Sequence, residues 1–292
     1  MAWNQLSVTS KETSAALISD LFSSLGALSV TFMDAGNQPV YEPDIGETRI
    51  WPYTKVIGLF DLSTDLDGIL NFLNFQLGKD VLTDWDSQLI ADERWELAWK
   101  DHFKPMLFGN RLWVCPTGED KNDGGQICLL MDPGLAFGTG THPTTSLCLE
   151  WLAANNVENK IVTDFGCGSG ILAIAALLLG AKQAFAIDID PQALTATQEN
   201  AKKNAVFDRL SCYLPEQFTQ QQADIVIANI LANPLIKLQP KLSQSVMPSG
   251  NLILSGILAD QSYDVVQAYQ SDFLIDQPAI QKNWCRIDGT KY

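Results

Sequence analysis

The sequence lacks long apolar runs, paired cysteines and any excess of basic residues. No stretch supplies about 18 or more clean apolar residues, and the first 24 residues show no basic segment followed by an apolar one. We therefore expect a cytoplasmic protein without a membrane span. The six cysteines show no CxxC spacing and mostly lie in apolar runs, which predicts buried, reduced thiols and gives no indication of a metal site.

Basic residues are also scarce, with 19 Lys and Arg against 34 Asp and Glu, which leaves a net charge of −15. Such a charge repels phosphates, so neither free nucleic acid nor an anionic membrane is expected as a partner. Residues 1–100 hold fifteen acidic and six basic side chains, which is well over half of the net charge. Two interpretations stay open: the acidity keeps the protein soluble, or it attracts a cationic partner.

What the chain does contain is ample material for packed cores, because 46% of its 292 residues are hydrophobic. That length favours two domains. Strand and helix patterns alternate over residues 1–88, which predicts a small α/β domain of the split βαβ, ferredoxin-like kind. A linker helix is predicted to begin at Ser87 as its cap and to carry Trp95 and Trp99 on one face. We place the linker at 89–104.

From residue 105 to 292, short apolar strands alternate with longer helices, which is typical of a Rossmann-like α/β domain with a mostly parallel sheet covered on both faces. Asp190 and Pro191 form a helix cap and a first helical residue. The last strands are predicted to pair antiparallel at the sheet edge. The predicted strands are 160–164, 183–188, 210–214, 223–229, 251–255, 273–276 and 284–287, and the predicted helices are 171–179 and 191–204.

A glycine-rich turn, Asp164-Phe165-Gly166-Cys167-Gly168-Ser169-Gly170, follows a strand and opens a helix. A dinucleotide-binding G-x-G-x-x-G fingerprint would need glycine where Ile171 stands, which weakens a nicotinamide dehydrogenase hypothesis. The G-x-G-x-G spacing resembles class I methyltransferases, in which this turn faces the amino-acid and ribose portions of S-adenosylmethionine. Gly166 either allows a tight turn or a close approach to the ligand.

Two polar residues lie at the carboxyl ends of other predicted strands. Asp188 follows the glycine turn by about twenty residues, where a carboxylate can accept hydrogen bonds from both ribose hydroxyls. The alternative role of helix cap is already taken by Asp190. Asn229 is placed to bind either a cofactor or an amine, although it could instead cap the helix near Pro234. The segment is similar to the N-P-P-aromatic motif of amino methyltransferases, but Ile230 and Leu231 replace the prolines.

Three segments together closely resemble the ribosomal protein L11 methyltransferases, the PrmA family: MDPGLAFGTGTHPTT at 131–145, the glycine turn, and ANILA at 228–232. The resemblance runs from about Trp85 to the C-terminus. It implies methyl transfer from S-adenosyl-L-methionine to lysine ε-amines and the N-terminal α-amine of a basic large-subunit ribosomal protein, which the N-terminal domain holds. It also places the cofactor contacts on four residues: Thr145, Gly166, Asp188 and Asn229.

Further expectations concern the reaction centre. Asn229 is the preferred residue for orienting the amine, and we expect the protein to act as a monomer. The Thr145 hydroxyl could reach the donor's carboxylate, or Thr145 could cap the next helix. His142 is more often positional than catalytic in such a loop. The rival hypotheses are a methyltransferase for a small molecule and a cofactor-binding adapter without catalysis.

Overall fold

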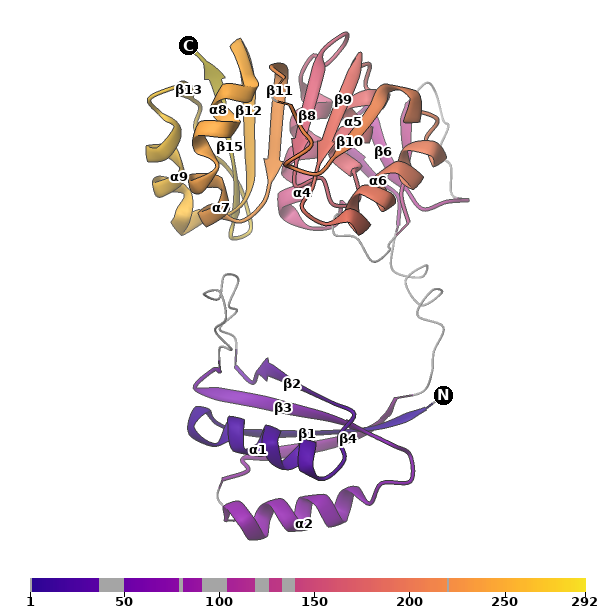
Figure 1. The fold of residues 1–292 in the computed structure, drawn as a ribbon, viewed down its shortest axis with the longest axis vertical. Helices are drawn as coiled ribbons and strands as arrows, with labels where there is room; N and C mark the ends of the chain where they lie inside the picture. The colour runs from indigo at the N-terminus through magenta and orange to yellow at the C-terminus, as the bar shows by residue number, and fades with distance from the viewer. Residues whose placement is uncertain are drawn as a thin grey trace. The chain divides into compact units, whose positions relative to one another are not determined.

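The computed structural model describes residues 2–36, 50–78, 81–90, 104–118, 126–132, 140–219 and 221–292. The chain divides into two compact units, Met1–Ala98 and Trp99–Tyr292. Figure 1 shows a sheet with helices in each unit. Within the described ranges, no helix is long and apolar enough to cross a membrane.

The N-terminal unit has the element order of a split βαβ fold, as the sequence predicts. Its antiparallel sheet has the order β2-β3-β1-β4. The apolar sides of α1 and α2 share one core with β1 and β3, and Phe22 packs edge-on against Phe60 at 5.5 Å. The elements are β1 (Trp3–Lys11), α1 (Glu12–Ser24), β2 (Ser29–Asp34), β3 (Tyr53–Phe60), α2 (Leu66–Leu77) and β4 (Asp84–Ile90).

The predicted start of the linker helix is wrong. Ser87 lies in the middle of β4 and is paired with Leu6 of β1, so it caps no helix. Backbone hydrogen bonds to a neighbouring strand outweigh the weak helical spacing of this segment, because tertiary context overrides local propensity. Leu89 and Ile90 also belong to β4, and residues 91–103 of the predicted linker, with Trp95 and Trp99, lie outside the described residues.

The C-terminal unit is built on a sheet with the order β10-β9-β8-β11-β12-β15-β13, with β14 paired to β15. The strands from β10 to β12 run parallel, and β15 and β13 continue the sheet antiparallel, as predicted for its edge. Its strands are β8 (Ile161–Phe165), β9 (Gln183–Ile187), β10 (Leu210–Tyr213), β11 (Ala223–Asn229), β12 (Val246–Leu258), β13 (Phe273–Ile275), β14 (Ala279–Gln281) and β15 (Trp284–Lys291).

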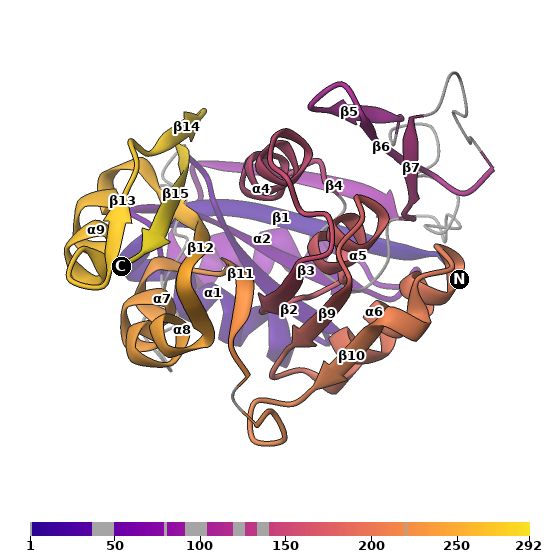
Figure 2. The same cartoon turned by 90° about the horizontal axis from the view of Figure 1, so that it is seen from above.

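Helices cover this sheet on both faces, which the continuous apolar strands require. Figure 2 shows α4, α5 and α6 on one side and α7, α8 and α9 on the other. A small sheet of β5 (Met106–Phe108), β6 (Leu112–Cys115) and β7 (Ile127–Leu130) precedes α4. The helices are α4 (Pro143–Ala154), α5 (Ile171–Leu178), α6 (Pro191–Lys203), α7 (Ala232–Lys237), α8 (Gln239–Ser245) and α9 (Ser262–Tyr269).

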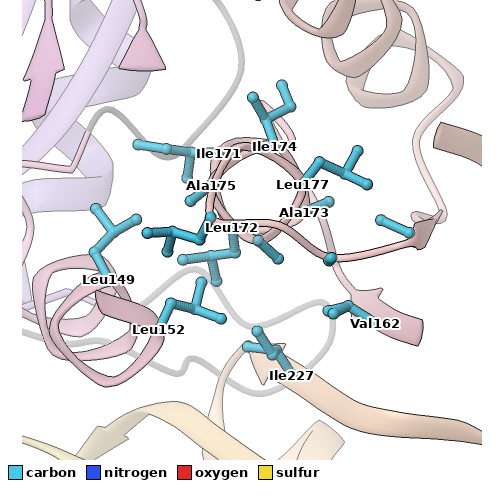
Figure 3. Close-up of a cluster of buried hydrophobic side chains, with 14 of the residues drawn as sticks. Leu149, Leu152, Val162, Ile171, Leu172, Ala173, Ile174, Ala175, Leu177 and Ile227 are labelled. Atoms are coloured by element: carbon cyan, nitrogen blue, oxygen red, sulfur yellow. The ribbon is translucent and has the colours of Figure 1, made fainter. Parts of the chain in front are cut away.

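Two hydrophobic clusters fill the two sides of the sheet. In the first, Leu149 and Leu152 of α4 meet the apolar face of α5 above Val162 of β8 and Ile227 of β11 (Figure 3). The chain leaves β8 toward β9 on one side, while β11 lies on the other, so the strand order reverses between β8 and β11. Ligands of open α/β sheets bind at the carboxyl ends of strands at such a reversal. The fold therefore directs attention to the residues that follow β8, β9 and β11.

Candidate functional site

The glycine turn lies directly after β8, as predicted. Gly166, Gly168 and Gly170 have φ angles of 74°, 54° and 77°, which residues with a side chain rarely adopt. The amide groups of Gly166 and Cys167 donate to the carbonyl oxygen of Ile187 at 2.7 and 3.1 Å. The end of β9 thus holds the turn in place by its backbone.

Gly166 also allows a close approach, but the group that approaches it in the structure is a side chain of the protein, that of Ile230. A Cβ at this position would lie 2.3 Å from Cγ2 of Ile230, the residue after β11. On the other side, a Cβ on Gly256 would lie 2.2 Å from the Ile230 carbonyl oxygen. Ile230 therefore fits between two glycines and brings the end of β11 against the glycine turn.

Asp188 follows β9 and is linked to the same turn. One carboxylate oxygen accepts the amide of Gly168 at 2.9 Å, and the other accepts the amide of Asp190 at 3.0 Å. Asp190 itself caps α6 by accepting the Gln192 amide at 2.9 Å, so the predicted cap at Asp190 is confirmed. Each Asp188 oxygen keeps a second lone pair, which leaves capacity to accept hydroxyl groups.

Thr145 and Asn229 are brought together from distant parts of the sequence. The Asn229 side-chain amide donates to the Thr145 hydroxyl at 3.2 Å. Thr145 is fully buried inside α4, whose cap is His142, so the alternative that Thr145 caps this helix is wrong. The alternative that Asn229 caps the next helix is also wrong, because the cap of α7 is Leu231.

Within the described part of the chain, the buried Oδ1 atoms of Asn229 and Asp164 have no hydrogen-bond partner. Asp164 pairs with Ile227 across β8 and β11, and Asn229 lies two residues further, so both side chains belong to one face of the sheet. The pKa of Asp164 is raised to about 7, mainly by burial and also by the nearby charge of Asp188, against a hydrogen bond from Ala173 that lowers it. Two buried acceptors without donors suit a ligand that carries N–H or O–H groups.

Asp164 is a candidate that the sequence analysis quoted only as part of the glycine turn. Its position at the end of a strand was visible, and a carboxylate in an apolar strand was a usable signal. What the sequence did not reveal is that the side chain is 1% exposed and that one oxygen has no partner among the described residues.

His142 has structural contacts that account for its position. Its ring packs edge-on against Trp284 at 4.8 Å, and Nδ1 lies 2.8 Å from the Thr144 hydroxyl. Burial lowers the pKa of His142, and the charge of Lys282 lowers it further. These contacts favour the positional role over the catalytic one. The glycine-rich residues 133–139, just before this helix, lie outside the described ranges.

Potential metal ligands do not gather at this site. Among the described residues, no three His, Cys, Asp or Glu side chains form a group that could hold a metal ion.

Comparisons with known proteins match the whole chain. The family model described as ribosomal protein L11 methyltransferase (PrmA) matches residues 2–292. A protein of that name from Hahella chejuensis is 48% identical over 291 residues, covering 100% of this chain and 99% of its own. Another, from Mannheimia succiniciproducens, is 50% identical over 290 residues, with 99% of each chain covered.

A solved structure of a protein with a similar name is also similar to this chain. The crystal structure of a ribosomal protein L11 methylase from Lactobacillus delbrueckii subsp. bulgaricus is 31% identical, with a TM-score of 0.59 over 65% of this chain and 99% of that one. Full-length sequence matches and a shared methyltransferase fold thus agree with the geometry at the strand ends. The chain belongs to the ribosomal protein L11 methyltransferase (PrmA) family.

Proposed function

We propose that this chain methylates ribosomal protein L11, transferring methyl groups from S-adenosyl-L-methionine to lysine ε-amines and to the N-terminal α-amine. Its full-length similarity to proteins named for this reaction supports the substrate. One observation supports the donor site: Asp188, the glycine turn and the Thr145–Asn229 pair lie at the ends of neighbouring strands.

The residues present fit the methyl donor. Asp188 would accept the two ribose hydroxyls, and the neighbouring Ile189 is 84% exposed and offers an apolar surface to a purine ring. The Thr145 hydroxyl accepts from Asn229, so its own hydrogen remains available to donate to the donor's carboxylate. Gly166 would place its backbone beside the amino-acid portion of the donor.

Asn229 is the residue we propose for orienting the amine. When bound, S-adenosylmethionine supplies a methyl carbon activated by the adjacent sulfonium, so the protein mainly has to align the nucleophile and exclude water. The side-chain NH₂ of Asn229 donates to Thr145, which fixes the orientation of the side chain and leaves its buried Oδ1 atom as an acceptor. An N–H of a neutral amine bonded to this oxygen would leave the nitrogen lone pair for attack. Because free lysine has a pKa near 10.4, desolvation in the site would help to supply the neutral form.

The N-terminal unit is the part we assign to substrate recognition. We propose that the first domain, predicted at residues 1–88, attracts the basic substrate, that the linker predicted at 89–104 begins after β4 ends at Ile90, and that 105–292 bind the donor. The excess of acidic residues before residue 100 supports attraction of a lysine-rich protein. We also propose that the enzyme acts as a monomer, and a ribosomal substrate supports a cytoplasmic location.

The test combines donor binding with product detection. Asp188→Asn keeps the side-chain shape but removes the charge that accepts hydroxyls, so we expect donor affinity to fall about tenfold or more by calorimetry. The exposed Asp208→Asn serves as the control. Incubation with purified ribosomal protein L11 should give mass increases in steps of one methyl group.

Each rival hypothesis has a distinct outcome in the same experiment. An unchanged mass of L11, with methylation of a small molecule instead, would favour a small-molecule methyltransferase. Donor binding without turnover on any acceptor would favour an adapter. Parent-like donor affinity in Asp188→Asn would contradict the placement of the donor.

A further inference from the structure

The glycine turn is held on one side by the polar edge of α6, which we define as Thr197 and Asn200. The Thr197 hydroxyl donates to the Gly168 carbonyl at 3.0 Å, and the Asn200 side-chain amide donates to the Ser169 carbonyl at 2.9 Å. Residues three apart lie on one face of a helix, so both can reach the turn together.

The contact between α6 and the turn is close. A Cβ on Gly170 would lie 2.6 Å from Cγ2 of Thr197 and 2.8 Å from its hydroxyl oxygen. Thr197 is fully buried, and its hydroxyl oxygen also lies 3.4 Å from Sγ of Cys167. Removing this hydroxyl would therefore leave the partly buried Gly168 carbonyl without its donor.

Gly168 connects the polar edge to the proposed ribose-binding carboxylate. Its amide is held by Asp188 at 2.9 Å and its carbonyl by Thr197 at 3.0 Å. Helix α6 begins at Pro191, three residues after Asp188, and its cap residue Asp190 donates its amide to Asp188. The distance between Asp188 and the turn is thus set by one rigid helix that contacts both.

We infer that Thr197 and Asn200 are positioning residues for the methyl donor. They fix the glycine turn relative to Asp188, so that the ribose and the amino-acid portion of one donor molecule meet their binding groups together. Neither side chain needs to touch the donor, since the effect passes through the carbonyls of Gly168 and Ser169. This inference rests on the donor placement proposed above.

The test compares two changes at Thr197 with one at Thr195. Thr197→Val keeps the shape and removes the hydroxyl, so we expect the dissociation constant of the donor to rise about tenfold in calorimetry, because the partly buried Gly168 carbonyl loses its hydrogen bond. Thr197→Ser restores the hydroxyl and should restore most of the affinity. Thr195 is exposed on the same helix, and its hydroxyl donates to the Pro191 carbonyl within that helix. Thr195→Val should therefore bind the donor like the parent.

Steady-state kinetics separate positioning from a purely structural role. KM for the donor should rise in Thr197→Val while kcat at saturating donor changes less. Asn200→Ala should move the same two constants in the same direction, which gives a second reading if Thr197→Val folds poorly. A structural role alone would lower the melting temperature of these variants without changing the donor dissociation constant.

Parent-like donor affinity in folded Thr197→Val and Asn200→Ala would overturn the inference. Equal losses in Thr197→Val and Thr197→Ser would overturn the role of the hydroxyl. Failure of the proposed function is distinguishable, because it would appear as parent-like affinity in Asp188→Asn. If Asp188→Asn loses affinity and the α6 variants do not, only the positioning inference fails.

Discussion

The antiparallel sheet of residues 3–90 and the mostly parallel sheet of residues 161–291 bury their strands differently. In the N-terminal unit, β3 alternates between buried and less buried residues, and most of β4 is exposed. In the C-terminal unit, β8, β9 and β11 are buried along nearly their whole length. A strand buried on both faces can present polar groups only where it ends, which is where the candidate site lies. A strand with an open face can present them along its whole length, as a surface for a protein partner would require.

The largest expected effect concerns packing. Leu254 of β12 is fully buried, whereas Leu89 of β4 is 64% exposed. Leu254→Ala should lower the free energy of unfolding by about 3 kcal/mol, because it leaves a cavity between close-packed elements. Leu89→Ala should change it by less than about 0.5 kcal/mol. Urea denaturation of each variant measures both values, and similar losses would mean that the two sheets are not buried as differently as the structure indicates.

An effect of similar size concerns pH. Burial raises the pKa of Asp164 to about 7 from the ordinary 3.8. The folded-state pKa lies above the unfolded one, so the contribution of Asp164 to the free energy of unfolding is greatest below about pH 4. This contribution is lost as the pH rises to about 7. Asp164→Asn should remove a decline in unfolding free energy of roughly 1 kcal/mol per pH unit across this range.

The N-terminal unit supplies the control for this pH prediction. Hydrogen bonds from Ser63 lower the pKa of the exposed Asp61, so its contribution is present above its unfolded pKa and is lost as the pH falls. Asp61→Asn should therefore leave the decline between about pH 4 and 7 unchanged. An unaltered pH profile in Asp164→Asn would contradict the buried, raised state of that carboxyl.

The smallest expected effect concerns charge. Raising the ionic strength from about 0.01 to about 0.15 M shortens the Debye length from about 30 to about 8 Å and should weaken binding of ribosomal protein L11 by about fivefold. The double variant Asp84→Asn with Asp86→Asn, on exposed β4, should reduce this salt dependence. The matched change of Asp208 and Asp260 in the C-terminal unit should reduce it less. A salt-independent affinity would mean that the acidity serves solubility alone.

Much of the C-terminal unit could be predicted because its signals are local. The strand at 223–229 was predicted with its observed ends, and the cap at Asp190 follows from one Asp-Pro pair. The strand β4 could not be predicted, since its partner β1 is about eighty residues away and its own spacing favours a helix. Local patterns identify elements reliably only where no distant partner competes.

The sequence by itself determined the class of fold, the family, and the four residues expected at the donor: Thr145, Gly166, Asp188 and Asn229. Short-range spacing was enough for the class of fold, because glycine turns, caps and strand ends are encoded within a few residues. The family and the four residues followed from the resemblance of three segments to the PrmA family. Only the tertiary structure decided that Asn229 donates to Thr145, that Ile230 fits between Gly166 and Gly256, and that α6 holds the turn. Each of these contacts joins residues about thirty to eighty positions apart, and such pairs meet only when the sheet order and the packing of the helices bring them together.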